Sequence, residues 1–580
     1  MPLVRAATKP VLAVGVTGHR PARLEGVDTE VLAISVGRVM AQLSAAAGTH
    51  RALRLVSSLA EGADSIAADQ ALALGWALDV VLPFSRADNL HDYPDAQVRA
   101  ALDSRLDRAE AVFALDGQRA DSGIEAQAYE RAGRIMLAQS DILLAIWNGD
   151  PPLGRGGTAQ IVAEAVAQGV PVLHIGIAPD APPELLWDGL DEDDVGQQSL
   201  ETVPRGPLDS LDRLIAHLAD PPPVDSDAPS PRSSSRLSLA VAYPILLAVT
   251  GVRRLQRSDF VLPPPEQAGQ QLTDVCQATR GTSDFSARLR EQLVPAFAAA
   301  DAISVESARR FRSAYIANFS LAAFAVLVSL AGLVLPVAAK PSLAAIELAT
   351  VGSILIITHT GRRAGWHRRW LDCRQTAERL RCLTVSAQLG ELALRGNTDP
   401  IARQVARGVR LPDAHVDARY LAGVRDDLRR LLDDQIAYLE GDAGRMHRLE
   451  HRLHRAGEWL FGLTATLCLA FLAVEIVAAA MPEFHPFVRP TLVWGTIGSA
   501  ALPAIGAAIY GIRMQSDFAG IAERNEALAE QLRRVRQVSL SEPLSFDALL
   551  RRVRRVSDLL IEDLANFLQA YHARPLVLPG

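Results

Sequence analysis

The chain has 580 residues and a formal net charge of −7 at pH 7, which leaves room for two or three domains and argues against a dedicated nucleic-acid binder. Its four cysteines are too few and too scattered for a disulfide scaffold or a zinc site: Cys276, Cys373, Cys382 and Cys468. The first apolar run, Pro10–Val16, is too short for a secretory signal and ends in polar residues. We therefore expect the N-terminal domain to lie in the cytosol.

Short apolar runs alternate with amphipathic segments through the first third of the chain. The predicted strands are Val11–Val16, Leu53–Val56, Leu78–Leu82, Ala111–Leu115, Ile142–Trp147 and Val170–Ile177. Helical periodicity predicts helices that include Asp64–Leu74, Ile124–Gln139 and Thr158–Gln168. Near-continuous apolar strands that alternate with helices indicate a parallel sheet covered on both faces. We expect a doubly wound, Rossmann-like α/β domain over residues 1–180.

A polar region separates this domain from the second half. Residues 181–236 begin with the acidic stretch Asp188–Asp194 and end in Pro221–Ser235, whose Pro, Ser and Asp cannot bury a core. We expect a flexible linker there and a helical connector over residues 237–318. Within the connector, Leu237–Val252 is short and contains Pro244, which favours a buried or interfacial segment over a membrane span.

Four hydrophobic spans mark the second half as a membrane domain. They are Phe319–Ala339, Leu343–Thr358, Trp459–Met481 and Thr491–Ile512. About 20 apolar residues suffice to cross a bilayer as a helix. We expect an α-helical membrane domain with two transmembrane hairpins, at residues 319–360 and 456–512. Residues 361–455 and 513–580 would form cytosolic helices.

Arginines set the expected orientation of the spans. Several arginines precede the first and third spans, and others follow the second and fourth. In the two hairpin loops, the only Lys or Arg residues are Lys340 and Arg489. The positive-inside rule then places both chain ends and the middle section in the cytosol. Glu347 and Glu475 are the only charges in the spans; each marks an ion path or reaches water at the interface.

The second half also shows a weak internal repeat. Each unit has a basic run, two hydrophobic helices and a charged helix, and both charged helices contain Ala-Glu-Arg, at 377–379 and 522–524. The amphipathic segments Trp366–Leu383 and Leu421–Leu439 carry apolar stripes that need partners. We expect these stripes to be contact surfaces between copies in a homo-oligomer.

Two loops at the predicted carboxyl ends of strands carry anion-binding chemistry. The first is Thr17-Gly18-His19-Arg20, in which a glycine admits close backbone approach and an arginine offers a fork for phosphate; the alternative is a tight turn with a surface arginine. The second runs from Ser57 to Asp64, and its candidate ligand-binding residues are Ser57, Ser58, Glu61 and Gly62. Hydroxyls and a glycine at a helix N-terminus suit phosphate or ribose, although ordinary helix capping explains them equally.

Three further features lie at the same edge of the sheet. Pro83-Phe84 would stack on a base; the alternative is a pair of apolar residues in a loop. Asp150 would bind a ribose hydroxyl; the alternative is that it stabilises its own turn. The strongest feature is Gly154-Arg155-Gly156-Gly157-Thr158, between a strand and a helix. Its glycines expose backbone N–H groups at the positive end of the helix dipole, so Gly156, Gly157 and Thr158 are candidate phosphate ligands. The alternative is a flexible surface loop.

Taken in chain order, these motifs resemble a known family. The motifs Gly15-Val16-Thr17-Gly18-His19-Arg20, Leu59 to Asp64, Leu82-Pro83-Phe84, Ala145 to Gly149 and Gly156-Gly157-Thr158 resemble a SLOG domain over about residues 10–180. That superfamily includes Smf/DprA proteins, LOG nucleotide hydrolases and nucleotide sensors of bacterial conflict systems. The second half resembles the SLATT membrane effector domains found with such sensors.

One departure from the family bears on activity. LOG hydrolases carry a Glu three residues after the Thr of Gly-Thr-x-x-Glu, and Ile161 occupies that place here. The resemblance therefore implies binding of a nucleotide or ADP-ribose-type molecule more than its hydrolysis, with no catalytic residue, metal or other cofactor. It implies a membrane-permeabilising effector in antiphage defence. The alternatives are a nucleotide-regulated channel or transporter and a membrane-tethered nucleotide hydrolase.

Overall fold

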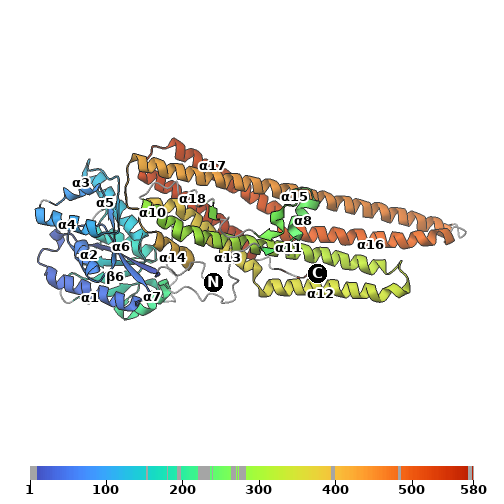
Figure 1. Ribbon diagram of the computed structural model, residues 1–580, viewed down its shortest axis with the longest axis horizontal. Helices are drawn as coiled ribbons and strands as arrows, with labels where there is room; N and C mark the ends of the chain where they lie inside the picture. Colours follow the sequence, from blue (N-terminus) through green and yellow to red (C-terminus); the bar gives the residue numbers. More distant parts are fainter. Residues whose placement is uncertain are drawn as a thin grey trace.

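A computed structural model describes most of the chain from residue 9 to residue 578. Not described are residues 1–8, 94, 152–154, 179–180, 192–197, 220–235, 238–239, 263–268, 271, 273–282, 393–398, 481–484, 573–575, 577 and 579–580. The expected linker Pro221–Ser235 and Gly154 lie outside the described residues. The chain forms an α/β domain at one end and an elongated bundle of long helices at the other (Figure 1).

A nine-stranded sheet organises the α/β domain. Its strands are β1 (Val11–Gly18), β2 (Ala52–Ser57), β3 (Ala77–Leu82), β4 (Ala111–Ala114), β5 (Ile142–Ile146), β6 (Val172–Ile175), β7 (Glu184–Leu186), β8 (Arg205–Pro207) and β11 (Ala414–His415). The order across the sheet is β11-β4-β3-β2-β1-β5-β6-β7-β8. Strands β1 to β6 and β11 pair in parallel, while β7 and β8 add antiparallel neighbours. The predicted parallel α/β sheet is confirmed.

Helices cover both faces of the sheet, as buried apolar strands require. One face packs against α1 (Thr29–Ala47), α2 (Ala63–Ala73), α4 (Ala96–Arg108) and α7 (Leu211–Ala219), and the other against α5 (Ser122–Ala138) and α6 (Thr158–Ala167). Local signals fix the helix ends. The Asp28 carboxylate accepts the N–H groups of Glu30 and Val31 at the start of α1, and Gly48, with φ of +68°, ends that helix.

The sheet takes strands from beyond the N-terminal third. Strands β7 and β8 and helix α7 continue the domain to Ala219. Strand β11 comes from the middle of the second half and pairs with β4, so that Val416 donates its N–H to the carbonyl of Ala114 at 2.8 Å. The α/β domain is therefore completed by a segment about 300 residues away from β4 in sequence.

The second half is helical. Its main helices are α8 (Ala242–Val249), α10 (Ser283–Arg288), the π-helical η5 (Leu289–Leu293), α11 (Val294–Ala331), α12 (Lys340–Arg363), α13 (Trp366–Ser386), α14 (Pro400–Val409), α15 (Ala418–Ala480), α16 (His485–Ser516), α17 (Phe518–Ser541) and α18 (Phe546–His572). The predicted second and fourth spans lie in α12 and α16, and the third lies in α15 as far as Ala480. The first lies in α11 only as far as Ala331, where that helix ends, so its predicted end at Ala339 is wrong. The predicted helix Leu421–Leu439 is the first part of α15, which continues without interruption into the third span.

The apolar stripes that sequence analysis assigned to contacts between copies are buried within the chain. Leu428 and Leu432 of α15 belong to the same core cluster as Leu528 and Leu532 of α17. This cluster also includes Phe113 and Leu143 of the sheet, so one hydrophobic core extends from a sheet face into the bundle. Contacts between copies through these stripes would require the core to open, so this expectation is wrong for the chain as folded.

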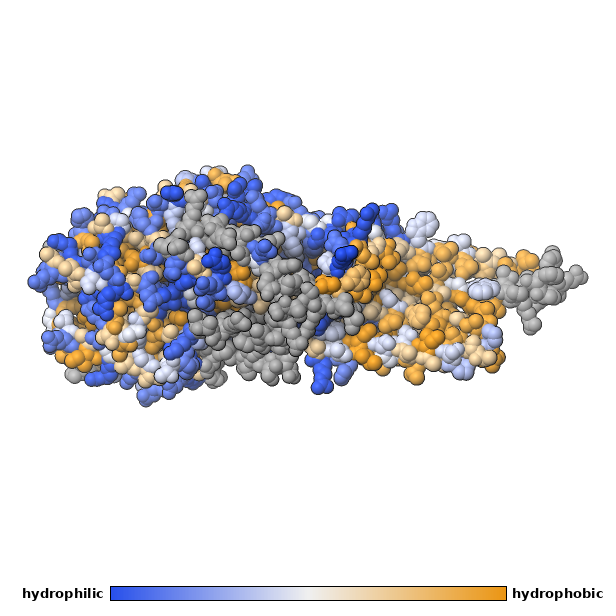
Figure 2. Space-filling view, in the orientation of Figure 1, coloured by the Kyte–Doolittle hydropathy of each residue, from blue (hydrophilic) through white to orange (hydrophobic). Residues whose placement is uncertain are grey.

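Apolar side chains are exposed along the far half of the bundle, where Figure 2 shows a broad hydrophobic surface over the hairpins. Examples are Leu348 and Ile356 of α12 and Phe461 and Leu469 of α15, all more than half exposed. In the described part of the chain, five helical stretches are long and apolar enough to cross a membrane. One of them, α1, packs on the sheet, and each of the other four overlaps one of the predicted spans. These features are those of a membrane protein.

Candidate functional site

The candidate site is a cavity of about 410 Å³ at the carboxyl ends of β1 and β5. These two strands are neighbours, and the strand order runs outward from them in both directions, through β2 on one side and β6 on the other. In open α/β sheets such a switch point leaves a crevice in which ligands bind. The cavity is lined by the loops after β1, β2 and β5 and by the start of α6.

The loop after β1 packs so closely against its neighbours that a side chain at Gly18 has no room. A Cβ at Gly18 would lie 2.3 Å from that of Ala63 and 2.9 Å from the carbonyl oxygen of Ile146. The backbone N–H of His19 donates to the same Ile146 oxygen at 3.0 Å, and the buried His19 ring lies 2.9 Å from the Asn148 side-chain oxygen. These contacts bind the loops after β1 and β5 together and bring α2 against them.

Glycine also shapes the turn into α2. Gly62 has φ of +100°, a conformation that disfavours other residues, and a Cβ there would lie 2.6 Å from the His19 carbonyl oxygen. That oxygen accepts the N–H of Ala63 at 3.1 Å. Ser57 is buried, and its hydroxyl accepts the N–H of Leu59 at 2.9 Å, which fixes the turn. Gly62 and Ser57 thus build the wall of the site without lining the cavity.

The start of α6 faces the cavity. Gly157 is the N-cap and offers no side-chain cap, and Gly156 has φ of +75° and donates its N–H to the Gln160 side-chain oxygen at 2.8 Å. The Thr158 hydroxyl donates to the Gly18 carbonyl oxygen at 2.9 Å, so it ties α6 to β1. The N-terminus of a helix attracts anions because its first N–H groups lack helical partners.

Charged side chains give the cavity a positive side. Arg20, Arg23 and Arg155 line it together with Asp64 and Asp150. The Arg20 guanidinium lies 4.5 Å from the centre of the Tyr129 ring, and the Arg155 Nε lies 3.0 Å from a carboxylate oxygen of Glu130. Three guanidiniums and a helix N-terminus form a setting suited to a phosphate group.

Among the groups that line the cavity, the Asp64 carboxyl group has the largest shift in pKa. It stands in the first turn of α2 and is 5% exposed. Burial raises the pKa of its carboxyl group to about 7, although hydrogen bonds with the backbone of Ala60 and Gly18 and the charge of Arg20 act in the opposite direction. Near neutral pH this carboxyl group exchanges a proton, which is a property of both ligand-sensing and catalytic groups.

The structure gathers most of the predicted site residues. Those that line the cavity are Thr17, Gly18, His19, Arg20, Ser58, Asp150, Gly156, Gly157 and Thr158. Glu61 and Pro83 line a smaller cavity of about 80 Å³ that shares Arg20, Ser58 and Tyr129 with the larger one. Phe84 is fully buried, edge-on to Tyr129 at 5.3 Å and beneath the guanidinium of Arg119 at 4.0 Å, so its ring is already covered.

Several lining residues were missing from the sequence-based set. Asp64 stood within the second motif but reads as a helix cap, and Arg155 stood within the glycine-rich loop. Tyr129 lies on α5, in the middle of an ordinary amphipathic helix, and no local signal distinguishes it. Ile161 is buried on the cavity wall, whereas Glu164 pairs with Arg134 at 2.7 Å and does not line the cavity.

The fold and the cavity define a class: a Rossmann-like α/β domain joined to a helical domain with the apolar surface of a membrane protein. No model of a known protein family matches the chain, and no curated protein matches it in sequence.

Proposed function

We propose that this protein is a membrane-anchored sensor of a nucleotide-derived signal, and that ligand binding to its α/β domain controls a membrane-permeabilising helical domain. The observation that carries the proposal is the cavity at the strand switch point, where the N-terminus of α6 meets Arg20, Arg23 and Arg155. A volume of about 410 Å³ suits a molecule of nucleotide size. The resemblance to SLOG domains supports the same ligand class.

The membrane part of the proposal places four spans in the bacterial inner membrane. Hairpins α11–α12 and α15–α16 would cross it. Both chain ends would lie in the cytoplasm, because the arginines lie at the end of each hairpin that faces away from its connecting loop. The resemblance to SLATT effectors supports a role in antiphage defence, in which the activated protein assembles as a homo-oligomer and permeabilises the membrane of the infected cell.

The structure provides a direct connection between the two parts. Strand β11 pairs with β4 in the sheet, and α15 begins at Ala418, three residues after β11 ends. This helix has 63 residues and, at 1.5 Å per residue, extends about 95 Å from the sheet to the far end of the third predicted span. A ligand that shifts the sheet can therefore act on a membrane helix through a single rigid element.

The direct test uses the full chain in liposomes loaded with a fluorescent dye. AMP, ADP, cyclic AMP and ADP-ribose are added in turn, and binding and dye release are measured. We expect at least one of them to bind and to increase release, and the Gly157→Asp variant to lose both responses to it. Binding of none, or release that does not depend on any of them, contradicts the proposal.

One observation favours a second candidate, a membrane-tethered nucleotide hydrolase. Asp64 lines the cavity, and burial raises the pKa of its carboxyl group to about 7, a value suited to proton transfer at neutral pH. Against it, Ile161 presents an apolar side chain where the related hydrolases carry Glu. Turnover of a nucleotide by the wild type that is lost in Asp64→Asn would favour the hydrolase over the sensor.

A further inference from the structure

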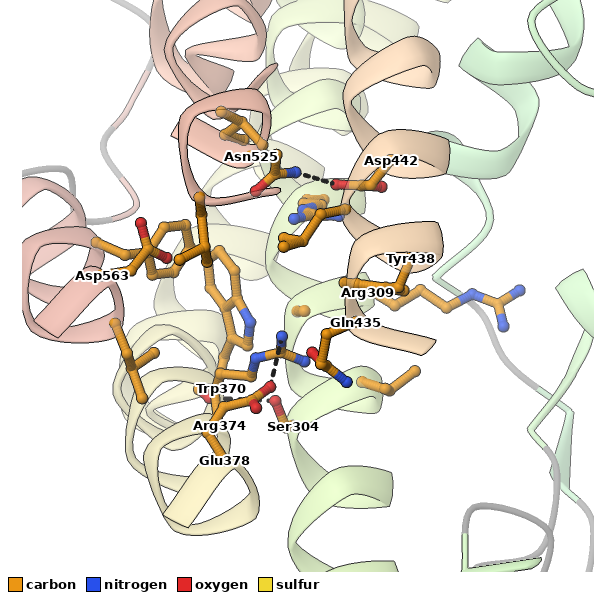
Figure 3. A pocket seen from close by; sticks show the side chains of 18 of the residues that line it. Ser304, Arg309, Trp370, Arg374, Glu378, Gln435, Tyr438, Asp442, Asn525 and Asp563 are labelled. Atoms are coloured by element: carbon orange, nitrogen blue, oxygen red, sulfur yellow. Dashed lines mark hydrogen bonds and ion pairs between the residues drawn. The ribbon is translucent and has the colours of Figure 1, made fainter. Parts of the chain in front are cut away.

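A second cavity lies in the helical half, well away from the sheet. Its volume is about 360 Å³, and it is lined by residues of α8, α11, α13, α15, α17 and α18 and by Arg253 and Asp259 from the segment after α8 (Figure 3). No residue lining it also lines the cavity at the switch point. Because α11 and α15 run directly from this cavity into the two hairpins, it lies at the base of the proposed membrane spans.

The walls of this cavity are polar at positions where a helix bundle normally places apolar residues. Trp370, Arg374 and Glu378 follow one another at four-residue intervals on one face of α13. On α15, Gln435 and Asp442 continue the face that buries Leu428 and Leu432 closer to the sheet. Replacing buried ion pairs by apolar residues often leaves a protein equally or more stable. Stability alone therefore gives no reason for this polar lining.

Some of the charges in the lining neutralise one another. Arg374 lies 2.8 Å from a carboxylate oxygen of Glu378, and the Asp442 carboxylate accepts a side-chain N–H of Asn525 at 3.1 Å (Figure 3). Asp442 also pairs with Arg445, at 2.8 Å, outside the cavity. The charges of these groups are paired within the fold, although the Glu378 carboxylate oxygens accept no hydrogen bond from the described residues.

Three other lining groups keep unused hydrogen-bonding capacity. Arg309 donates to the carbonyl oxygens of Ala240 and Ser258, and within the described residues its buried Nη2 has no hydrogen-bond partner. Gln435 is 4% exposed, and no residue in the described ranges hydrogen-bonds to its amide. The carboxyl group of Asp563 forms no hydrogen bond or ion pair with the residues described, and burial raises its pKa. A buried polar group without a partner costs about 1–3 kcal/mol, and the Arg309 Nη2 is such a group. A molecule that bonded to it and also to Gln435 and the half-buried Asp563 would use all three groups.

The positions of these groups indicate what would bind. Arg309 and Arg312 stand three residues apart on α11, and the Arg312 guanidinium lies 5.4 Å from the centre of the Tyr243 ring and 5.3 Å from that of Trp370. Figure 3 shows Asp563 and Gln435 on opposite sides of the cavity. An arginine pair attracts an anion, and a carboxyl group and an amide oxygen accept N–H or O–H groups.

We infer that the helical half binds a second small molecule, with a phosphate group toward Arg309 and Arg312 and an amino or hydroxyl group toward Asp563 and Gln435. Two sources share this chemistry: a soluble nucleoside phosphate and the phosphoethanolamine head group of a membrane lipid. Bound there, either would join α18 to α11 and α15 and so fix the cytosolic ends of both hairpins. This inference is independent of the ligand at the sheet.

The test uses the full chain carrying Gly157→Asp, which occupies the phosphate position at the sheet and leaves the helical cavity as it is. Binding of AMP and of phosphoethanolamine is measured by calorimetry in detergent, and lipid retained after purification is identified by native mass spectrometry. We expect one of these molecules to bind with one site per chain. Hydrogen bonds to charged groups contribute about 1.5–3 kcal/mol, so Arg309→Gln should weaken binding about tenfold or more.

Gln435→Leu serves as the variant that keeps the fold. It has a similar size and removes an unpaired amide, so the thermal midpoint should be equal or higher while affinity falls about fivefold or more. AMP as the ligand identifies a soluble source, and retained phosphatidylethanolamine identifies a lipid source. If the Gly157→Asp chain binds neither molecule and retains no phosphatidylethanolamine, the inference is overturned. Binding or retention that neither Arg309→Gln nor Gln435→Leu changes also overturns it.

Discussion

Arg407 of α14 and Asp141, which directly precedes β5, form a buried ion pair across 266 residues of sequence. The Arg407 Nε donates to one carboxylate oxygen at 2.9 Å, and its Nη2 lies 2.9 Å from the other. The same carboxylate accepts the backbone N–H of Ala13 in β1 at 3.0 Å. The helical half is thus bonded to the amino ends of the two strands whose carboxyl ends line the cavity.

A second pair of contacts strengthens this junction. Arg410 has φ of +68°, a strained conformation for a residue with a side chain, and its Nη2 lies 2.6 Å from the buried carboxylate of Asp79 in β3. Arg54 of β2 shares that carboxylate at 3.4 Å, and Arg410 also pairs with Glu110. These bonds hold α14 against the amino ends of the strands, and the pairing of β11 with β4 places the start of α15 beyond the carboxyl end of β4.

Removing Arg407 should destabilise the junction. Arg407→Ala leaves the Asp141 carboxylate buried without its ion-pair partner, which typically costs about 3–5 kcal/mol. We expect the thermal unfolding midpoint to fall by several degrees, measured by scanning calorimetry in detergent. Arg108→Ala, which removes an exposed arginine at the end of α4, is the matched control and should leave the midpoint within about one degree. Equal midpoints for the two variants would show that the pair contributes nothing.

Gly157→Asp should separate ligand binding from folding. Asp is a favoured N-cap, and Gly157 now gives α6 no side-chain cap, so the α/β domain should be as stable as the wild type or gain up to about 1 kcal/mol. A carboxylate at the phosphate position should reduce the affinity for a phosphate-bearing nucleotide about 100-fold, measured by calorimetry. Gly157→Asn provides the same cap without the charge and should bind within about tenfold of wild type. Unchanged affinity in the Asp variant would move the phosphate elsewhere in the cavity.

The pKa of Asp64 predicts a pH-dependent stability. Its carboxyl group has a pKa of about 7 in the fold and an ordinary value of 3.8, so the native state holds the proton more tightly than the unfolded chain. The native state is therefore favoured below pH 4 and loses stability as the pH rises toward 7, by about 2–4 kcal/mol. Asp64→Asn should raise the unfolding midpoint at pH 8 and change it little at pH 4.5. Asp69→Asn, an exposed change on the same helix, should show no such difference between the two pH values.

The strands of the sheet were predictable because their apolar runs are local signals bounded by turns. The run at Ile142–Trp147 corresponds to β5, and the glycine-rich loop after it leads to the cavity. Strand β11 was not predictable, since a two-residue strand carries no periodicity and its partner β4 is about 300 residues away. For the same reason, nothing local indicates that Leu428 packs on α17 within the chain. The polar lining of the second cavity is likewise visible only after six helices are assembled.

The positions of the arginines predict the membrane topology, and reporter fusions can test that prediction. Reporter fusions at Gly396 and at Gly580, both outside the described residues, should give a cytoplasmic signal in a bacterial host. A third fusion, after Ala339 in the loop between α11 and α12, should give a periplasmic signal and serves as the internal control. A periplasmic signal at Gly396 or at Gly580 would contradict the arrangement with both chain ends in the cytoplasm.

The last prediction concerns the route of coupling. The signal has two routes that can be tested separately. One is the segment 221–235, which lies outside the described residues, and the other is the junction formed by β11, Arg407 and Arg410. A signal that travels through the junction does not depend on the length of that segment. Insertion of a few Gly and Ser residues within 225–233 should therefore leave ligand-dependent dye release from liposomes close to that of the wild type.

A variant that alters the junction should have the opposite effect and reduce ligand-dependent release. The double change Arg407→Met and Asp141→Leu replaces the ion pair by apolar side chains, which keeps the site filled and limits the loss of stability. Neither residue lines the ligand cavity, so nucleotide affinity should stay within about threefold of wild type. Ligand-dependent release should fall severalfold, because α14 keeps the bonds of Arg410 to Asp79 and Glu110 but loses its bonds to the carboxylate beside β1 and β5. If the insertion abolishes release and the double variant does not, the signal passes through segment 221–235 and the junction is only structural.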